Sequence, residues 1–262
     1  MRRRLDRELV RRGLVASRTQ AQEVIREGRV VVSGGPGLRA TRLVAPEEPI
    51  HVERPPARFV SRGGEKLTAA LDAFAISVAG RRALDAGAST GGFTDCLLQR
   101  GVAAVVAVDV GHGQLAWSVR TDPRVTALER TNVRALTAEQ LDGPVDLAVA
   151  DLSFISLTTV APALVACTTD DADLVLLCKP QFEAGRARVG KGGVVRDPRV
   201  HFAVLAEVVD ALAERGIVVV DALRSPLRGA DGNTEFFLHG RKDGLPVDSA
   251  VLAQIAEPME DQ

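Results

Sequence analysis

Four ionisable residues stand where predicted helices and strands begin or end. They are two lysines and two acids, namely Lys66, Asp151, Lys179 and Glu235. Amines and carboxylates that share a site can hold or transfer a proton. A lysine beside an apolar strand is also costly to bury without a partner. Taken alone, Lys179 therefore favours a structural interpretation, a buried ion pair with Asp151, over a catalytic one.

A glycine-rich loop over residues 85–94 follows a predicted strand and opens a predicted helix. A P-loop would need lysine where Phe93 stands, and a dinucleotide loop would need glycine where Ser89 stands, so neither phosphate cradle is supported. Asp109 ends the next predicted strand, 22 residues after Gly87, where an acid can accept both hydroxyls of a ribose. A ribose site without a phosphate cradle suits S-adenosylmethionine. The alternative is a simple tight turn.

Asn132 follows the third predicted strand and could hydrogen-bond an adenine, although a surface-loop asparagine explains it equally well. We predict that the cofactor is bound by Gly87, Ser89, Thr90, Gly91, Gly92, Phe93, Asp109, Asn132 and Asp151. No metal site is expected, because the three cysteines are scattered and form no CxxC pair.

The elements that must position these residues alternate between apolar strands and helices from about residue 60 onward. Strands are predicted over 83–86, 103–108, 125–129, 145–150, 174–178, 217–223 and 235–239. Helices are predicted over 65–78, 93–100, 137–140, 157–165 and 201–214. This alternation predicts a mostly parallel sheet covered on both faces, with ligands bound beyond the carboxyl ends of the strands.

The first 30 residues carry nine arginines and four acids, although the whole chain of 262 residues has a net charge of only −1. Helical spacing of apolar residues, followed by Gly13, predicts a first helix. Ser17 and Gln20 form a capping box for a second, and residues 30–32 and 50–52 predict short strands. A basic end of this kind is expected to bind nucleic acid or another polyanion, or to be a solvated helix surface.

The overall composition is that of a globular protein, with 46% hydrophobic and 26% charged residues. No apolar run approaches the roughly 18 residues that a membrane span needs, and no signal peptide is recognisable. We therefore expect a cytoplasmic protein without a membrane partner.

The N-terminal pattern resembles the RNA-binding domain first known in ribosomal protein S4. It comprises Arg4-Leu5-Asp6, Leu9, Arg12-Gly13-Leu14, Ser17-Arg18, Ala21, Ile25, Gly28-Arg29-Val30 and Val32. The resemblance implies that basic side chains of the two helices bind structured RNA. We predict RNA contacts at Arg3, Arg4, Arg18, Arg29 and Arg62, each of which could equally be a solubilising charge.

Together, Lys66, Asp151, Lys179 and Glu235 resemble the Lys-Asp-Lys-Glu tetrad of FtsJ-type ribose 2′-O-methyltransferases. The whole chain resembles the TlyA, or hemolysin A, family through the basic N-terminal domain, the glycine loop and four further motifs: ADLSFIS (150–156), KPQFE (179–183), GGVVRD (192–197) and GNTE (232–235). The resemblance implies S-adenosylmethionine-dependent 2′-O-methylation of cytidine in 16S and/or 23S ribosomal RNA, within 30S and/or 50S subunits. One departure is Ala57-Arg58-Phe59, where some members carry Arg-Ala-Trp.

This resemblance implies a Rossmann-like class I methyltransferase with a seven-stranded, mostly parallel sheet, preceded by a small α+β S4-like domain. We predict an S4-like domain over 1–54, a linker over 55–60, a methyltransferase domain over 61–245 and a tail over 246–262. We expect a monomer when free.

A ribose 2′-hydroxyl is a poor nucleophile, so the enzyme must align the reactants and remove one proton. We propose Lys179 as the base, because a second lysine and burial lower a lysine pKa while carboxylates raise it. Lys66 would bias its charge and position the hydroxyl, and Asp151 and Glu235 would orient the lysines.

Three alternatives compete with this interpretation. A non-enzymatic RNA-binding factor would use the same basic domain. A pore-forming toxin, implied by the name hemolysin, is disfavoured by the absence of a membrane-spanning or amphipathic segment. A base methyltransferase is disfavoured because such enzymes often carry Asn-Pro-Pro-aromatic or a cysteine where Asp151 opens Asp-Leu-Ser-Phe.

Overall fold

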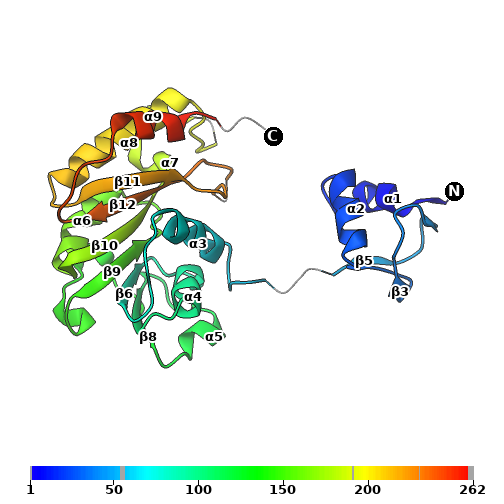
Figure 1. Ribbon diagram of the computed structural model, residues 1–262, viewed down its shortest axis with the longest axis horizontal. Coiled ribbons are helices and arrows are strands. Elements are labelled where there is room, and N and C mark those ends of the chain that lie inside the picture. The colour runs from blue at the N-terminus through cyan, green and yellow to red at the C-terminus, as the bar shows by residue number, and fades with distance from the viewer. Residues whose placement is uncertain (1, 54–56, 191, 230, 259–262) are drawn as a thin grey trace. The chain divides into compact units, whose positions relative to one another are not determined.

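The computed structural model describes residues 2–53, 57–190, 192–229 and 231–258. The chain divides into two compact units, Met1–Ala57 and Arg58–Gln262. Figure 1 shows the helices and strands of each unit. Each unit has hydrophobic core residues of its own.

The larger unit contains one seven-stranded sheet in the order β11-β12-β10-β9-β6-β7-β8. Five strands run parallel, namely β6 (Arg82–Ala86), β7 (Ala104–Val108), β8 (Val125–Leu128), β9 (Val145–Ala150) and β10 (Thr168–Cys178). Strand β12 (Phe236–Arg241) runs antiparallel to both of its neighbours, β10 and β11 (Val218–Arg224). The prediction of a seven-stranded, mostly parallel sheet is confirmed.

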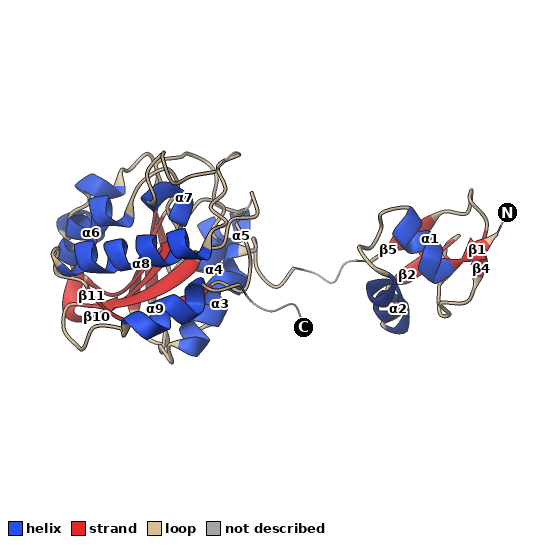
Figure 2. Cartoon of the chain, turned by 90° about the horizontal axis from the view of Figure 1, so that it is seen from above, coloured by secondary structure: helices blue, strands red, loops and turns tan. Residues whose placement is uncertain are grey.

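Helices cover both faces of this sheet, which explains why its central strands are apolar at nearly every position (Figure 2). One face packs against α6 (Leu157–Ala166), α8 (Pro198–Ala213) and α9 (Ser249–Ala256). The other packs against α3 (Gly63–Ala73), α4 (Gly92–Gln99) and α5 (Trp117–Arg120). In β9, Ala148 and Ala150 face the first set, and Leu147 and Val149 face the second.

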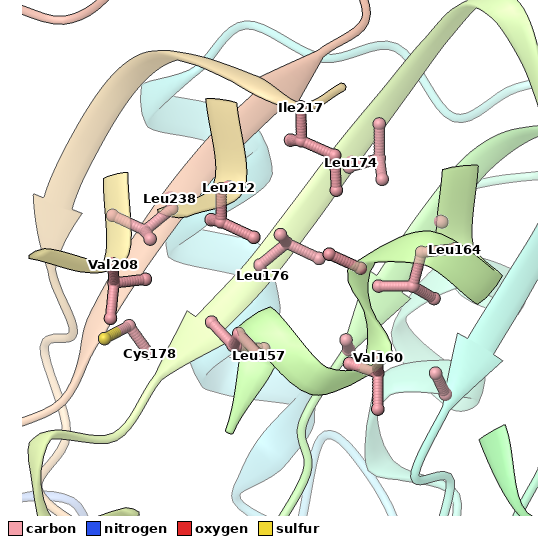
Figure 3. Close-up of a cluster of buried hydrophobic side chains, with 14 of the residues drawn as sticks. Leu157, Val160, Leu164, Leu174, Leu176, Cys178, Val208, Leu212, Ile217 and Leu238 are labelled. Atoms are coloured by element: carbon pink, nitrogen blue, oxygen red, sulfur yellow. The ribbon is translucent and has the colours of Figure 1, made fainter. Parts of the chain in front are cut away.

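Figure 3 shows part of the first cluster, where Leu157 and Val160 of α6 lie near Leu176 of β10. Leu212 of α8 and Leu238 of β12 belong to the same cluster. Because the helices that follow β9 and β10 bury their apolar sides in this layer, the loops at the strand ends start from fixed positions.

The smaller unit has helices α1 (Leu5–Arg11) and α2 (Arg18–Arg26) and two small sheets. One sheet pairs β1 (Arg3–Arg4) with β4 (Leu43–Val44), and the other orders β3 (Gly35–Pro36), β2 (Val30–Val32) and β5 (Ile50–Val52). Ser17 caps α2 by accepting from the Gln20 backbone N–H at 3.2 Å, as its capping box predicts. The Gln20 side chain reaches back to Ala16 N at 2.8 Å.

The structure differs from the sequence prediction in several elements. Helix α3 ends at Ala73 rather than 78, because Ala75 adopts a left-handed φ of 53°. Strand β10 begins at Thr168, six residues earlier than predicted. Helix α9 lies within the predicted tail and buries Leu252 and Ala256 in the core of the larger unit. The predicted helix over 137–140 is a short 3-10 helix, η2 (Glu139–Leu141).

The predicted linker is only partly described. Pro55 and Pro56 lie outside the described residues, whereas Phe59 is buried in the core of the larger unit. The backbone N–H of Val60 donates to the Asp95 carboxylate at 2.8 Å. Within the described ranges, every helix is too short or too polar to cross a membrane.

A buried carboxylate, Asp173, links neighbouring strands at the end of the sheet opposite the glycine loop. Asp173 of β10 accepts from His239 at 2.8 Å, from Arg81 at 2.6 Å and from Arg241 at 3.2 Å. Burial acts to raise the pKa of Asp173, but the hydrogen bonds from His239 and Arg81 outweigh it and hold the pKa at about 2. The carboxylate is therefore stabilised in its charged form by the folded state.

We expect Asp173→Asn to lower the free energy of unfolding at pH 7 by about 3 kcal/mol, because three donors lose a charged acceptor. The folded pKa lies below the unfolded value of about 4, so this contribution is present above pH 4 and lost as pH falls toward 2. Urea denaturation at pH 7 and pH 3 measures the free energy of unfolding. The difference in this free energy between the native protein and the variant should be smaller at pH 3. Asp243→Asn, at an exposed partner of Arg241, should change little; equal losses for both variants would contradict this account.

Candidate active site

All four predicted catalytic residues lie at the carboxyl edge of the parallel strands. Asp151 follows β9 and Lys179 follows β10. Glu235 precedes β12, and the antiparallel register pairs Phe236 with Cys178, so the start of β12 lies beside the end of β10. Lys66 comes from α3. The topology thus brings together side chains from four separate elements.

These four side chains form two ion pairs in one cavity of about 300 Å³. The Lys66 Nζ donates to Glu235 Oε2 at 2.6 Å, and both groups are buried. The Lys179 Nζ lies 2.6 Å from Asp151 Oδ1 and donates to Ser153 Oγ at 3.1 Å. Lys179 is 9% exposed, whereas the Asp151 side chain is 24% exposed, so the second pair stands nearer solvent.

The glycine loop forms another wall of the same cavity. Gly87, Ser89, Thr90, Gly92 and Phe93 line it, as does Arg62. Gly87 has a φ of 89°, and a Cβ there would lie 2.7 Å from the Asp151 carbonyl oxygen. Only glycine therefore allows the loop to approach the end of β9 so closely.

Beside this wall, Asp109 organises the loop rather than lining the cavity. Its carboxylate accepts from the backbone N–H of Ser89 at 2.8 Å and of Gly111 at 2.7 Å. Gly91 begins α4 with a φ of 92° and lies outside the lining residues. Asn132 caps the short helix η1 (Val133–Ala135) by accepting from Arg134 N at 3.0 Å, and it too lines neither this cavity nor the small one beside Asp109.

Under the loop, Asp85 of β6 is fully buried and accepts from Thr94 Oγ1 at 2.6 Å. Burial raises the pKa of Asp85 to about 7. The bond joins β6 to α4 across the glycine loop, which fixes both ends of the loop.

Two polar residues that were not among the predicted site residues, the half-buried Glu183 and the buried Asn233, hold the surrounding loops. Glu183 ends the short helix α7 (Pro180–Glu183) and accepts from Ser156 Oγ at 2.6 Å and Leu157 N at 2.8 Å. Burial raises the pKa of Glu183. Asn233 accepts from Val195 N and donates to Gly193 O, both at 3.0 Å. Both residues stand inside the KPQFE and GNTE motifs, which is the signal that could have identified them.

The loop that Glu183 anchors carries an exposed aromatic side chain. Phe154 is 90% exposed and has a φ of 63°, an unfavourable conformation for an aromatic residue. Its ring lies 5.0 Å from that of Phe182. The preceding residue, Ser153, lines the cavity and contacts Lys179, so the exposed Phe154 ring belongs to a loop that forms part of the cavity wall.

The arginines predicted to contact RNA have different environments. Arg4 and Arg18 both donate to the buried Asp6, at distances of 3.0 to 3.1 Å. Arg29 pairs with Glu27 at 2.8 Å. Burial acts to raise the pKa of Asp6, but the two guanidinium groups lower it to about 2. Arg3 is exposed in β1, and Arg62 belongs to the larger unit.

Comparison with known proteins defines the class of molecule. Residues 59–242 match the family described as FtsJ-like methyltransferase, and residues 3–36 match the S4 domain. The seven-stranded sheet with its glycine loop and the basic two-helix unit are thus a methyltransferase fold and an S4 domain.

Relatives then identify the family. The chain is 56% identical over 236 residues to a Mycobacterium tuberculosis protein named 16S/23S rRNA (cytidine-2′-O)-methyltransferase TlyA, covering 90% of this chain and 88% of that one. It is 39% identical to Hemolysin A of Brachyspira hyodysenteriae, covering 90% and 98%. A solved structure of a candidate hemolysin from Streptococcus thermophilus has a TM-score of 0.73 and 37% identity, covering 97% and 95%. The chain belongs to the TlyA family of methyltransferases.

We expect Glu183→Ala to lower the free energy of unfolding by about 2 kcal/mol, because a buried N–H and a hydroxyl lose their acceptor. Glu183→Gln should lower the free energy of unfolding by less, because its amide oxygen can still accept a hydrogen bond from the Leu157 backbone N–H. Urea denaturation measures both. Glu207→Ala, at an exposed partner of Arg188, is the matched control. A Gln variant as unstable as the Ala variant would contradict a role based on hydrogen-bond acceptance.

Proposed function

We propose that the protein transfers a methyl group from S-adenosylmethionine to the ribose 2′-hydroxyl of cytidine in 16S and/or 23S ribosomal RNA. The observation that carries the proposal is the single cavity lined by two lysine–carboxylate pairs and a glycine loop. The printed name of the 56% identical relative supports the choice of substrate.

The residues beside β6 and β7 suit the proposed cofactor. Gly87 lines the cavity where the loop approaches the end of β9, and the Asp109 carboxylate stands at the end of β7, where an acid can accept from ribose hydroxyls. When bound, S-adenosylmethionine supplies a methyl group activated by a sulfonium. We assign Gly87, Ser89, Thr90, Gly92 and Phe93 to its binding with Asp109, and we retain Gly91, Asn132 and Asp151 as weaker candidates.

Lys179 is the proposed base. In its neutral form the Nζ would accept the proton that the 2′-hydroxyl loses on methylation, while the cofactor would supply the methyl group and leave as the neutral thioether S-adenosylhomocysteine. Asp151, 2.6 Å away, then balances the ammonium charge that forms. Ser153 fixes the amine by a second hydrogen bond, which limits its orientations.

The other pair positions the substrate. Lys66 is held by Glu235 at 2.6 Å and lines the same cavity, so its remaining N–H groups can hold the hydroxyl oxygen. Phe154, on the loop that forms part of the cavity wall, offers an exposed ring on which a base of the RNA can stack.

The S4 domain would bind the ribosomal subunit. Arg3, Arg4, Arg18 and Arg29 are its proposed phosphate contacts, with Arg62 at the cavity. Asp6 holds Arg4 and Arg18 at the start of the two helices, which reduces the freedom they lose on binding. We further propose that the free protein is a monomer that acts in the cytoplasm, where ribosomal subunits are found.

We expect Lys179→Ala to abolish methyl transfer and leave cofactor binding intact. The measurement is transfer of label from S-adenosylmethionine to separated, unmodified 30S and 50S subunits, with S-adenosylhomocysteine binding measured by calorimetry. Lys242→Ala is the matched control, because Lys242 contacts only Thr168 and Asp170 among the described residues. Full turnover by the Lys179 variant would refute the base assignment, and no label from the wild-type protein would refute the function.

We expect Asp109→Ala to weaken S-adenosylhomocysteine binding by about tenfold or more, because charged hydrogen bonds contribute about 1.5–3 kcal/mol. Calorimetry on the folded variant checks this. Asp122→Ala, which removes a half-buried carboxylate paired with Arg124 outside both cavities of the site, should bind normally. Unchanged affinity of the Asp109 variant would place the ribose elsewhere.

A further inference from the structure

A second cavity, of about 580 Å³, lies in the larger unit next to the catalytic one. The segment before α8, the loop between β11 and β12 and the end of α9 form its walls. Its volume is typical of sites that bind a nucleotide-sized ligand, which span roughly 300–1,000 Å³. Neither the proposed chemistry nor the cofactor uses it.

The two cavities share a wall. Thr234 lines the second cavity, and the next residue, Glu235, lines the catalytic cavity and holds Lys66. Gly229 packs against the Glu235 carboxylate so closely that a Cβ there would lie 2.5 Å from Oε1. Asn233, between Gly193 and Val195, keeps the two loops together. A polymeric substrate that extends from the catalytic cavity past Glu235 would therefore reach the second cavity next.

The second cavity is positively charged. Arg196, Arg224 and Arg228 line it, against one acidic lining residue, Asp231. His201 is buried, and burial lowers its pKa, so it adds no charge at pH 7. An anion therefore finds three guanidinium groups on this surface.

The three arginines differ in how they are held. Arg224 is fixed at the end of α9, where it donates to Ile255 O and Ala256 O at 2.9 Å. Burial and the charge of Arg228 lower the pKa of Arg224, which means that its charge is not fully balanced there. Arg196 and Arg228 are exposed and pair with no carboxylate in the described part of the chain. Arg228 donates to the Gly232 carbonyl oxygen at 3.3 Å, a single exposed contact, so both guanidinium groups are available to a ligand.

Apolar side chains complete the pocket. Val194, Pro198 and Pro226 line it beside the arginines. A nucleotide presents the same combination, an anionic phosphate next to a flat base and an apolar sugar surface.

We propose that this cavity binds the nucleotide next to the methylated one in the RNA strand, with its phosphate held by Arg196 and Arg228. The proposal rests on the proposed function, because a ribose held beside Lys179 is joined to a phosphate on each side. The strand must therefore pass a surface that accepts an anion as it leaves the catalytic cavity. Arg224, held by the carbonyl groups at the end of α9, adds a fixed positive charge to the cavity wall.

The test uses the full chain with Arg196→Gln and Arg228→Gln, singly and combined. Binding to unmodified ribosomal subunits is measured against salt in the presence of S-adenosylhomocysteine, so that it does not depend on methyl transfer. Each lost phosphate contact should reduce the slope of log K against log[salt] by about 0.7–0.9. The KM for subunits should rise about tenfold in the double variant, with kcat and cofactor affinity unchanged.

Two control variants keep the outcome specific. Arg228→Lys retains the charge and should keep the wild-type salt slope. Arg215→Gln removes an exposed arginine after α8, at the other end of that helix, and should behave as wild type. A wild-type slope and KM in the double variant would overturn the proposal. So would a lower kcat at unchanged KM, which would mean that the loop acts on Glu235 instead.

A separate arm tests a free nucleotide as the ligand. Cytidine 5′-monophosphate is titrated against the wild-type protein and the double variant, and no saturable binding is expected. Saturable binding that the double variant loses, with subunit binding unchanged, would assign the cavity to a free nucleotide and overturn the proposal. Failure of wild-type methyl transfer with a reduced salt slope in the variants would refute the proposed function and leave the RNA subsite standing.

Discussion

The pairing of two buried lysines with two carboxylates is the constraint on which this site depends. An ammonium group removed from water without a partner is strongly destabilising. The fold must therefore bring Glu235 to Lys66 and Asp151 to Lys179 within hydrogen-bonding distance. Asp151 and Lys179 meet because they follow the neighbouring parallel strands β9 and β10, and Glu235 reaches the same edge because β12 runs antiparallel to β10 and starts where β10 ends. The glycine loop, the packed helices and the hydrogen bonds of Glu183 and Asn233 all hold the ends of those strands in place.

Much of this arrangement could be predicted from sequence because its signals are local. Apolar runs mark the strands, and the residue after each run marks the ligand edge, which is how Asp151 and Lys179 were found. The pairing could not be predicted in the same way. Lys66 and Glu235 are 169 residues apart, and only the sheet order brings them together. Helix α9 was missed because its apolar residues follow a region of Gly, Pro and Asp, and its burial depends on packing against α8 and β11.

Charge counting was least informative in the small unit. The excess of arginine suggested a free basic surface, yet Asp6 is buried and holds two of those arginines, and Glu8 holds Arg11 and Arg12. Hydrogen bonds from arginines hold the pKa of both acids at about 2, so both remain charged at any physiological pH. Part of the arginine excess is therefore held in place by buried acids, whereas Arg3 and Arg7 are exposed and have no such acid partner in the described residues.

The position of β12 in the chain has a consequence for the synthesis of the protein. Chains are made from the N-terminus, and domains fold as their segments emerge. Lys66, Asp151 and Lys179 all emerge before Glu235, so the carboxylate that pairs with Lys66 is made only after α8 and β11. A chain interrupted before that point would carry an unpaired lysine at the sheet edge and an incomplete cavity. We therefore expect fragments that end before Glu235 to lack one of the two ion pairs of the site.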